Sequence, residues 1–186
     1  SVRLHERLQK AEAQLMVERY LKRIQHVIEG FSGEVVNSEG DELMAVFTEP
    51  ANACQAAIEM QKRIGDLPPS SAVKLAMRIG LSHGSVNKTE SDYTGQTIDI
   101  AACMTGIAKP GQILASLPLV AALPAQLKMM AKKRDDVSIN RSIQSVFELV
   151  IPKLNYRPRV ENSLFTVTEE GEIKTQVLYL RYLDKS

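Results

Sequence analysis

The stretch that decides the fold reads Gly33-Glu-Val-Val-Asn-Ser-Glu-Gly-Asp-Glu-Leu-Met-Ala-Val-Phe47. Two runs typical of β-strands, residues 34–38 and 43–47, flank a Gly40-Asp41 pair. A short glycine-containing connection between two such runs is the sequence signal of a β-hairpin. The sequence therefore predicts an antiparallel strand pair here, and the segments on either side must cover it.

Helical patterns lie on both sides of this hairpin. Over residues 1–30, apolar side chains recur every three or four positions with charged ones opposite, and Gly30 is a favoured C-terminal stop. A break in this helix near residues 9–11 is left open. Residues 49–67 predict a second helix, with a proline tolerated in its first turn and Pro68-Pro69 after it.

The remaining pattern alternates between strands and helices. Strands are predicted at residues 73–81, 112–116 and 146–151, and helices at 97–108 and 117–130, the latter limited by two prolines. The order α–β–β–α–β–α–β–α–β predicts an α+β sandwich, with a mainly antiparallel sheet and helices packed on one face.

The composition changes after residue 151. Residues 152–158 contain two prolines and are typical of a linker. Beyond them, residues 164–168 and 173–183 alternate around a Glu-Glu-Gly turn, like a hairpin. We therefore divide the chain into a domain at residues 1–151 and a tail at residues 152–186.

Composition excludes several classes of protein. The chain has 186 residues, of which 44% are hydrophobic and 24% charged, as in globular proteins. Because Lys plus Arg (23) nearly balances Asp plus Glu (22), no basic surface for nucleic acid or an anionic membrane is expected. No run approaches the roughly 20 apolar residues of a membrane span. Only Cys54 and Cys103 are present, which favours a reduced, cytoplasmic compartment.

Four strings occur in order along the chain and carry a family resemblance. They are residues 33–47, Met77-Arg-Ile-Gly-Leu-Ser-His-Gly84, Asp92-Tyr-Thr-Gly-Gln-Thr-Ile-Asp-Ile-Ala-Ala-Cys-Met104, and Lys109-Pro-Gly-Gln-Ile-Leu114. Together they resemble the class III nucleotidyl cyclases, the adenylate/guanylate cyclase catalytic domains, over roughly residues 1–150. The resemblance implies a ferredoxin-like sandwich that dimerises, with active sites at the interface. It also implies two metal ions, Mg or Mn, that drive attack of the ribose 3′-hydroxyl on the α-phosphate.

The resemblance assigns binding roles to three residues. Asp41 matches the family's second metal-binding aspartate, although a turn aspartate is more commonly just solvated. Asn37 stands where the family has a purine-selecting lysine. Asp92 stands at the partner purine-selecting position, and an aspartate there resembles adenylate rather than guanylate cyclases. ATP is therefore expected more than GTP.

The resemblance also shows where catalytic positions are substituted. The family's transition-state asparagine falls at Asp99 and its transition-state arginine at Cys103. A thiol supplies no positive charge to the transferred phosphoryl group, and an aspartate adds a negative one. The family's Lys-Gly-Lys motif is not found, and residues 138–141 occupy its region.

The family's first metal-binding aspartate lies on a strand just before the first helix. This chain starts at Ser1-Val-Arg-Leu, which resembles the residues after that strand, so we expect the strand to be absent here. That strand is central in the family, and an empty place would leave two strand edges unpaired. Residues 177–183 are favoured to fill it, in their own chain or by exchange with a partner. The alternative is that the tail begins a following module.

The sequence thus predicts a degenerate adenylate/guanylate cyclase-like domain in cyclic-nucleotide-type signalling. It would act as a dimerising, nucleotide-binding regulatory module, as a homodimer or a heterodimer with another cyclase domain. The alternative is an active adenylate cyclase, converting ATP to cyclic AMP and pyrophosphate, completed by an upstream segment and a partner chain. A third hypothesis is an interaction domain whose nucleotide pocket has decayed.

Overall fold

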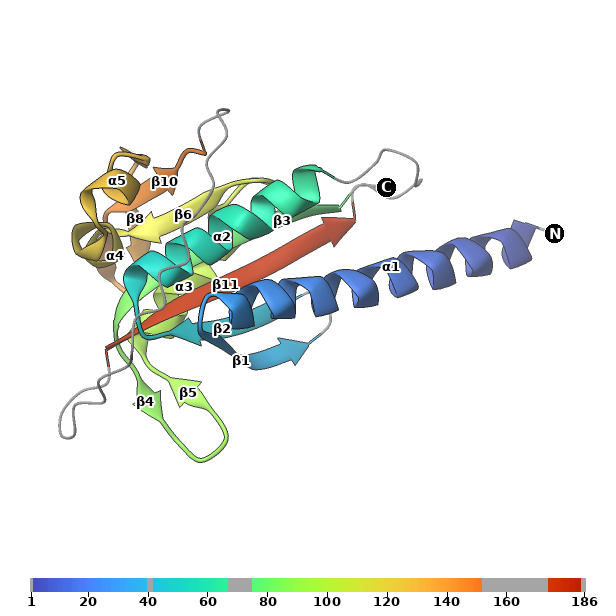
Figure 1. Cartoon of the computed structure of the whole chain (residues 1–186), viewed down its shortest axis with the longest axis horizontal. Coiled ribbons are helices and arrows are strands. Elements are labelled where there is room, and N and C mark those ends of the chain that lie inside the picture. The colour runs from blue at the N-terminus through green and yellow to red at the C-terminus, as the bar shows by residue number, and fades with distance from the viewer. Residues whose placement is uncertain (1, 40–41, 67–74, 152–173, 185–186) are drawn as a thin grey trace.

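The computed structural model describes residues 2–39, 42–66, 75–151 and 174–184. A seven-stranded sheet with the order β1-β2-β11-β3-β6-β10-β7 forms its centre (Figure 1). β3 and β6 pair in parallel and the other neighbours pair antiparallel, so the predicted α+β fold with a mainly antiparallel sheet is confirmed. The strands are β1 Gly33–Glu39, β2 Glu42–Phe47, β3 Leu75–Ser85, β6 Ile113–Ser116, β7 Ala131–Lys133, β10 Val146–Leu149 and β11 Lys174–Asp184.

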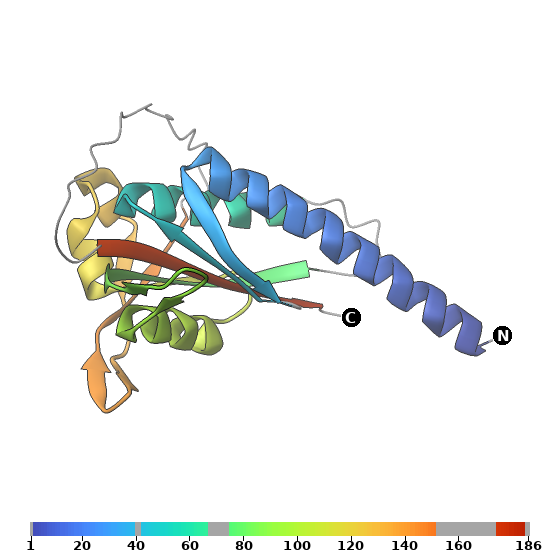
Figure 2. The same cartoon turned by 90° about the horizontal axis from the view of Figure 1, so that it is seen from below.

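Helices cover both faces of the sheet. Figure 2 shows α1 and α2 above it and α3 below. The prediction of helices on one face is therefore wrong. The physical reason lies in β2, where Leu43, Ala45 and Phe47 enter the core under α1 and α2, while Met44 and Val46 pack with residues of α3. The helices are α1 Val2–Gly30, α2 Pro50–Gly65, α3 Gln96–Ile107, α4 Leu117–Ala122 and α5 Ala125–Lys128.

The predicted hairpin is formed by β1 and β2. Its register runs from Gly33 opposite Phe47 to Glu39 opposite Glu42, with a bulge between Val35 and Asn37. A Cβ atom on Gly33 would lie 2.7 Å from Ile28 Cγ2, so only glycine lets the end of α1 lie against the start of the hairpin. The turn itself, residues 40–41, lies outside the described residues.

Two helical predictions need correction. No break occurs near residues 9–11, and α1 is one helix of 29 residues whose N-terminal part extends beyond the sheet (Figures 1 and 2). The reason is that Gln9-Lys10-Ala11 contains only good helix formers. The helix expected at 117–130 is instead divided, because Pro124 cannot donate a hydrogen bond and disfavours helix in the residue before it.

The C-terminal strand β11 lies in the middle of the sheet. It runs antiparallel to both neighbours, with residues 176–181 paired to β2 and 174–184 paired to β3. Its backbone therefore satisfies the facing edges of both strands. The predicted linker at 152–158 and strand at 164–168 lie outside the described residues.

Two short ribbons complete the fold. β4 Asn87–Lys88 pairs with β5 Tyr93–Thr94, and β8 Val137–Ile139 pairs with β9 Ser142–Gln144. A search of the described helices finds none with the length and apolar character that crossing a membrane requires.

Candidate functional site

Helix α3 carries both predicted catalytic positions, and it lies directly on β3. A Cβ atom on Gly80 of β3 would collide with the carbonyl oxygen of Ala101 and lie 2.6 Å from Thr105 Oγ1. The hydroxyl of Ser82, on the same face of β3, donates a hydrogen bond to the carbonyl oxygen of Thr97. The small residues of the Met77–Gly84 string therefore allow α3 to pack closely against β3 and fix its position on the sheet.

Asp99 and Cys103 lie one turn apart on α3 and so share one side of the helix. Asp99 is exposed, and Cys103 is a partly exposed free thiol. The structure thus brings these two predicted positions together.

Asp99 has a hydrogen-bond partner from a distant segment. Asn140 Nδ2 donates to Asp99 Oδ2 over 3.3 Å. Asn140 and Arg141 form the turn between β8 and β9, both with positive φ (48° and 66°). The partner of the carboxylate is therefore a neutral amide, and neither Asp99 nor Cys103 contributes a positive charge.

Asp92 organises its own loop between β4 and β5. Its Oδ1 accepts a hydrogen bond from the Tyr93 backbone N–H (2.7 Å), and its carbonyl oxygen accepts one from Thr89 N–H (2.8 Å). Lys88 Nζ lies 5.2 Å from the centre of the Tyr93 ring. A hydrogen bond to Tyr93, and to a smaller extent the charges of Tyr93 and Glu34, raise the pKa of Lys88.

The nucleotide-binding predictions are not joined to the α3 positions by polar contacts. Asn37 is exposed on β1 just after the bulge, and Asp92 is exposed in its loop. Within the described ranges, no hydrogen bond or ion pair links either residue to Asp99 or Cys103. The four side chains stand on three separate elements.

The described residues do not by themselves fit a metal ion. Asp41 lies outside them. Among residues 2–39, 42–66, 75–151 and 174–184, no group of three or more His, Cys, Asp or Glu side chains could hold a metal. The metal role of Asp41 stays a prediction.

Comparison with known proteins decides the family. The sequence model of the family described as "Adenylate and Guanylate cyclase catalytic domain" matches residues 2–149. The chain belongs to this cyclase family. An uncharacterized protein of Mycobacterium tuberculosis (strain H37Rv) is 31% identical over 121 residues, which cover 65% of this chain but only 31% of that protein.

Solved structures with the same fold include two cyclases. The adenylate/guanylate cyclase/hydrolase from Silicibacter pomeroyi is 23% identical, with a TM-score of 0.66, and the match covers 80% of this chain and 90% of that one. An adenylate cyclase from Trypanosoma brucei is 20% identical, with a TM-score of 0.64, covering 82% and 86%. At these identities the likeness establishes the cyclase fold alone.

Sequence reasoning missed Asn140 in this cyclase domain. The β8–β9 ribbon was not predicted from the sequence. Asn140 does offer a signal for it, because asparagine is favoured in two-residue hairpin turns and short alternating runs flank it on both sides. The alternation over three residues on each side was too short to stand out. Its contact with Asp99 spans 41 positions of sequence and left no local signal.

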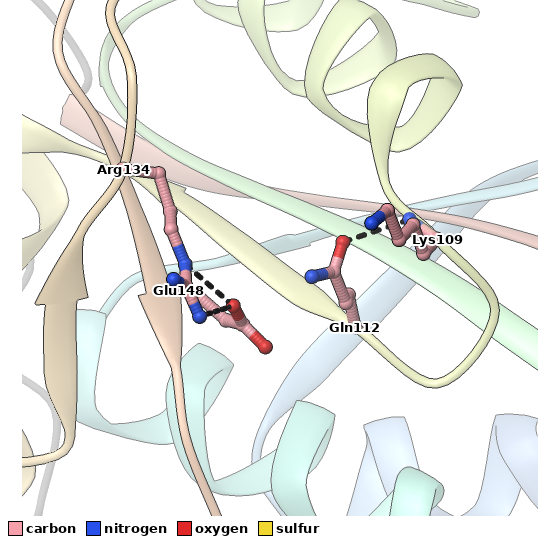
Figure 3. Close-up of polar contacts among 4 residues, drawn as sticks. All are labelled: Lys109, Gln112, Arg134 and Glu148. Carbon is pink, nitrogen blue, oxygen red and sulfur yellow. Dashed lines mark hydrogen bonds and ion pairs between the residues drawn. The ribbon is translucent and has the colours of Figure 1, made fainter.

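The fourth string of the family resemblance is part of the framework. The side-chain Oε1 of Gln112 accepts a hydrogen bond from the Lys109 backbone N–H (2.8 Å), which closes the turn before β6 (Figure 3). The buried side chain of Gln61 on α2 donates to the Met77 carbonyl oxygen (3.2 Å).

An ion pair lies beside this framework. Arg134 Nε donates a hydrogen bond to Glu148 Oε2 (2.7 Å), so the charge of Arg134 is paired with that of Glu148 (Figure 3).

Proposed function

We propose that this chain is a degenerate cyclase domain that dimerises, binds a purine nucleotide and regulates without efficient catalysis. The observation that supports this proposal best is the Asp99–Cys103 pair on α3, whose carboxylate accepts a hydrogen bond from Asn140. By the resemblance, both positions match transition-state residues of the family. Neither the Asp99 carboxylate nor the Cys103 thiol carries a positive charge.

The chemical consequence follows from what phosphoryl transfer needs. Negative charge spreads over the transferred group in the transition state, and fixed cations and donors stabilise it. At Asp99 a carboxylate would face that charge, and its repulsion would raise the barrier. Catalytic groups act together, so the effects of losing them are not additive. Losing two of them is therefore expected to remove most of the catalytic activity.

Nucleotide binding is assigned to Asn37 and Asp92, with ATP favoured over GTP. Mg²⁺ or Mn²⁺ would accompany the nucleotide if Asp41 retains its metal-binding role. Two exposed side chains, Asn37 and Asp92, leave both assigned positions open to a ligand. The small number of cysteines and the near-neutral charge favour a cytoplasmic module with no nucleic-acid partner.

The second candidate is an active adenylate cyclase completed by an upstream segment and a partner chain. The observation that favours it is the exposure of Asp99 beside a partly exposed Cys103, because both side chains could contact a second chain once the bond from Asn140 to Asp99 is given up. A partner carrying the asparagine and arginine would then complete one active site. The product, cyclic AMP, distinguishes the two candidates.

The test is calorimetric titration of the full chain with a non-hydrolysable ATP analogue in the presence of Mn²⁺. Saturable binding that Asp41→Ala weakens at least about tenfold supports the proposal, since a charged ligand contact contributes roughly 1.5–3 kcal/mol. Asp66→Ala, at an exposed aspartate after α2, is the matched control and should bind like the parent. Absence of binding at millimolar ligand overturns the proposal.

A further inference from the structure

A row of charged residues crosses the three central strands. The register places Arg181 of β11 directly opposite Glu42 of β2 and, on its other side, directly opposite Arg78 of β3. The row therefore reads Glu42, Arg181, Arg78 and carries one positive charge in excess.

Arg78 lies on the face of the sheet that α3 covers. Its neighbours Met77 and Ile79 belong to the core on the α1–α2 side, and side chains alternate along a strand. Gly80, two residues further, lies against α3. On this side the ends of β3 and β11 extend beyond α3 (Figure 2), and Arg78 is partly exposed.

Two features of this row are unfavourable without a further group. Like charges directly opposite on neighbouring strands destabilise a sheet, and Arg78 and Arg181 are such a pair. In addition, Arg78 Nε is buried and has no hydrogen-bond partner among the described residues. A buried unpaired donor in a native protein calls for an explanation, and a bound ion is one of the common ones.

We propose that Arg78 and Arg181 form an anion site that holds a phosphate group of the nucleotide without a divalent metal ion. This inference rests on the proposed function and deepens it. The positive charges of the two arginines would take the place of the charge that a metal ion brings to a phosphate group.

Arginine suits this role better than lysine. The guanidinium group is always charged and offers donors in a planar fork that matches phosphate oxygens. A phosphate at this place would accept a hydrogen bond from the unpaired Nε of Arg78.

The test titrates the full chain with pyrophosphate in excess EDTA and follows binding by calorimetry. We expect saturable binding that Arg78→Gln and Arg181→Gln each weaken about tenfold or more, the loss typical of a charge-assisted contact. Arg63→Gln is the matched control, because Arg63 pairs with Glu59 on the outward side of α2 and should leave binding unchanged. Arg78→Lys keeps the charge but not the Nε–H and should fall between Arg78→Gln and the parent.

The outcomes separate this inference from the proposed function. Binding of the ATP analogue only with Mn²⁺, with no pyrophosphate binding in EDTA, overturns the anion site and leaves the proposed function standing. Pyrophosphate binding that depends on Arg78, with no binding of the ATP analogue, overturns the proposed function and the claim that the bound phosphate group belongs to a nucleotide. Pyrophosphate binding that neither arginine variant weakens also overturns the anion site. Circular dichroism tests whether each variant folds. If Arg78→Gln does not fold, the weaker binding expected of Arg78→Lys tests the role of Arg78 instead.

Discussion

Asn140 donates a hydrogen bond to Asp99 across 3.3 Å, and it thereby joins the turn of the β8–β9 ribbon to the first turn of α3. By the family resemblance, Asp99 is expected where the cyclases have an asparagine, and Asn140 in the region of their lysine motif. If these assignments hold, an amide donor and a carboxylate acceptor bond to each other at two positions expected to belong to the catalytic site. This contact stabilises the free protein without supplying positive charge to a ligand.

Restoring the family residues should improve nucleotide binding. The double variant Asp99→Asn/Cys103→Arg removes one negative charge and adds one positive charge on the same side of α3. We expect it to bind the Mn²⁺–ATP analogue about tenfold or more tightly in calorimetry, because each charged contact to phosphate contributes roughly 1.5–3 kcal/mol.

The control for this double variant changes the same charges elsewhere. Asp66→Asn/Gln55→Arg, at an exposed residue just after α2 and a partly exposed residue on it, should leave the affinity within about twofold of the parent. Equal affinities for the parent and the α3 variant would contradict the assignment of these two positions. A cyclic AMP assay of the α3 variant shows whether binding is accompanied by turnover.

The contact between α3 and β3 should be intolerant of any side chain at Gly80. Gly80→Ala would drive a methyl group against the Ala101 carbonyl oxygen and within 2.8 Å of the Thr105 backbone nitrogen. We expect a loss of about 1–3 kcal/mol in the free energy of unfolding, measured by urea denaturation.

Gly106 provides the matched control for Gly80. It lies on the same helix α3, is exposed, and a Cβ atom there would meet nothing within 4 Å. Gly106→Ala should therefore stabilise the protein by about 0.5–1 kcal/mol, since alanine restricts the unfolded chain and favours helix. Equal effects of the two substitutions would show that α3 does not lie on β3 as described.

Local signals were sufficient to predict the hairpin and the flanking helices. The Gly40-Asp41 pair and the prolines after α2 act within a few residues, so their effect can be read from the sequence. The covering of both sheet faces also has a local signal in the sequence. Residues 43–47 form an unbroken apolar run, which is typical of a strand buried on both sides.

Contacts between distant segments were the part that the sequence could not give. The alternation of residues 177–183 predicts a strand, and only the family resemblance favours a central place for it. Its register with β2 and β3 depends on the whole sheet and has no local signal. The Asn140–Asp99 contact likewise depends on how the β8–β9 ribbon lies against α3. The candidate site was therefore predictable as a set of positions and not as a geometry.

The register of β11 makes a prediction that cysteine pairs can test. Leu178 stands opposite Ala45 of β2, so Leu178→Cys/Ala45→Cys should form a disulfide on mild oxidation. Shifting one partner by a residue, as in Leu178→Cys/Met44→Cys, puts the two positions on opposite faces and should prevent the bond. A Cys103→Ser background removes the accessible native thiol.

Electrophoresis without reductant reads out the result. A monomer that migrates faster only for the Leu178–Ala45 pair supports β11 lying between β2 and β3 of its own chain. A covalent dimer would show exchange of β11 between two chains. Disulfide formation by the shifted pair, and not by the matched pair, would contradict the register.

The two native cysteines should differ sharply in reactivity. Burial raises the pKa of the Cys54 thiol from 9.0 to about 12, whereas Cys103 is partly exposed. Because the thiolate is the reactive form, iodoacetamide at pH 8 should label Cys103 and leave Cys54 unlabelled until the protein unfolds. Mass spectrometry after digestion identifies the labelled residue, with Cys103→Ser as the control that should take up no label when native.

The same pKa shift predicts how stability depends on alkaline pH. The folded pKa of Cys54 lies above the unfolded value, so the stability gained by keeping the thiol neutral is complete below pH 9 and is lost as pH rises from 9 toward 12. Cys54→Ala should therefore lose less stability between pH 8 and pH 10 than the parent, although its stability at pH 8 is lower because of the small cavity. Urea denaturation at both pH values measures the difference. Parallel losses in the two proteins, or native labelling of Cys54 at pH 8, would show that this thiol is not enclosed between α2 and the sheet.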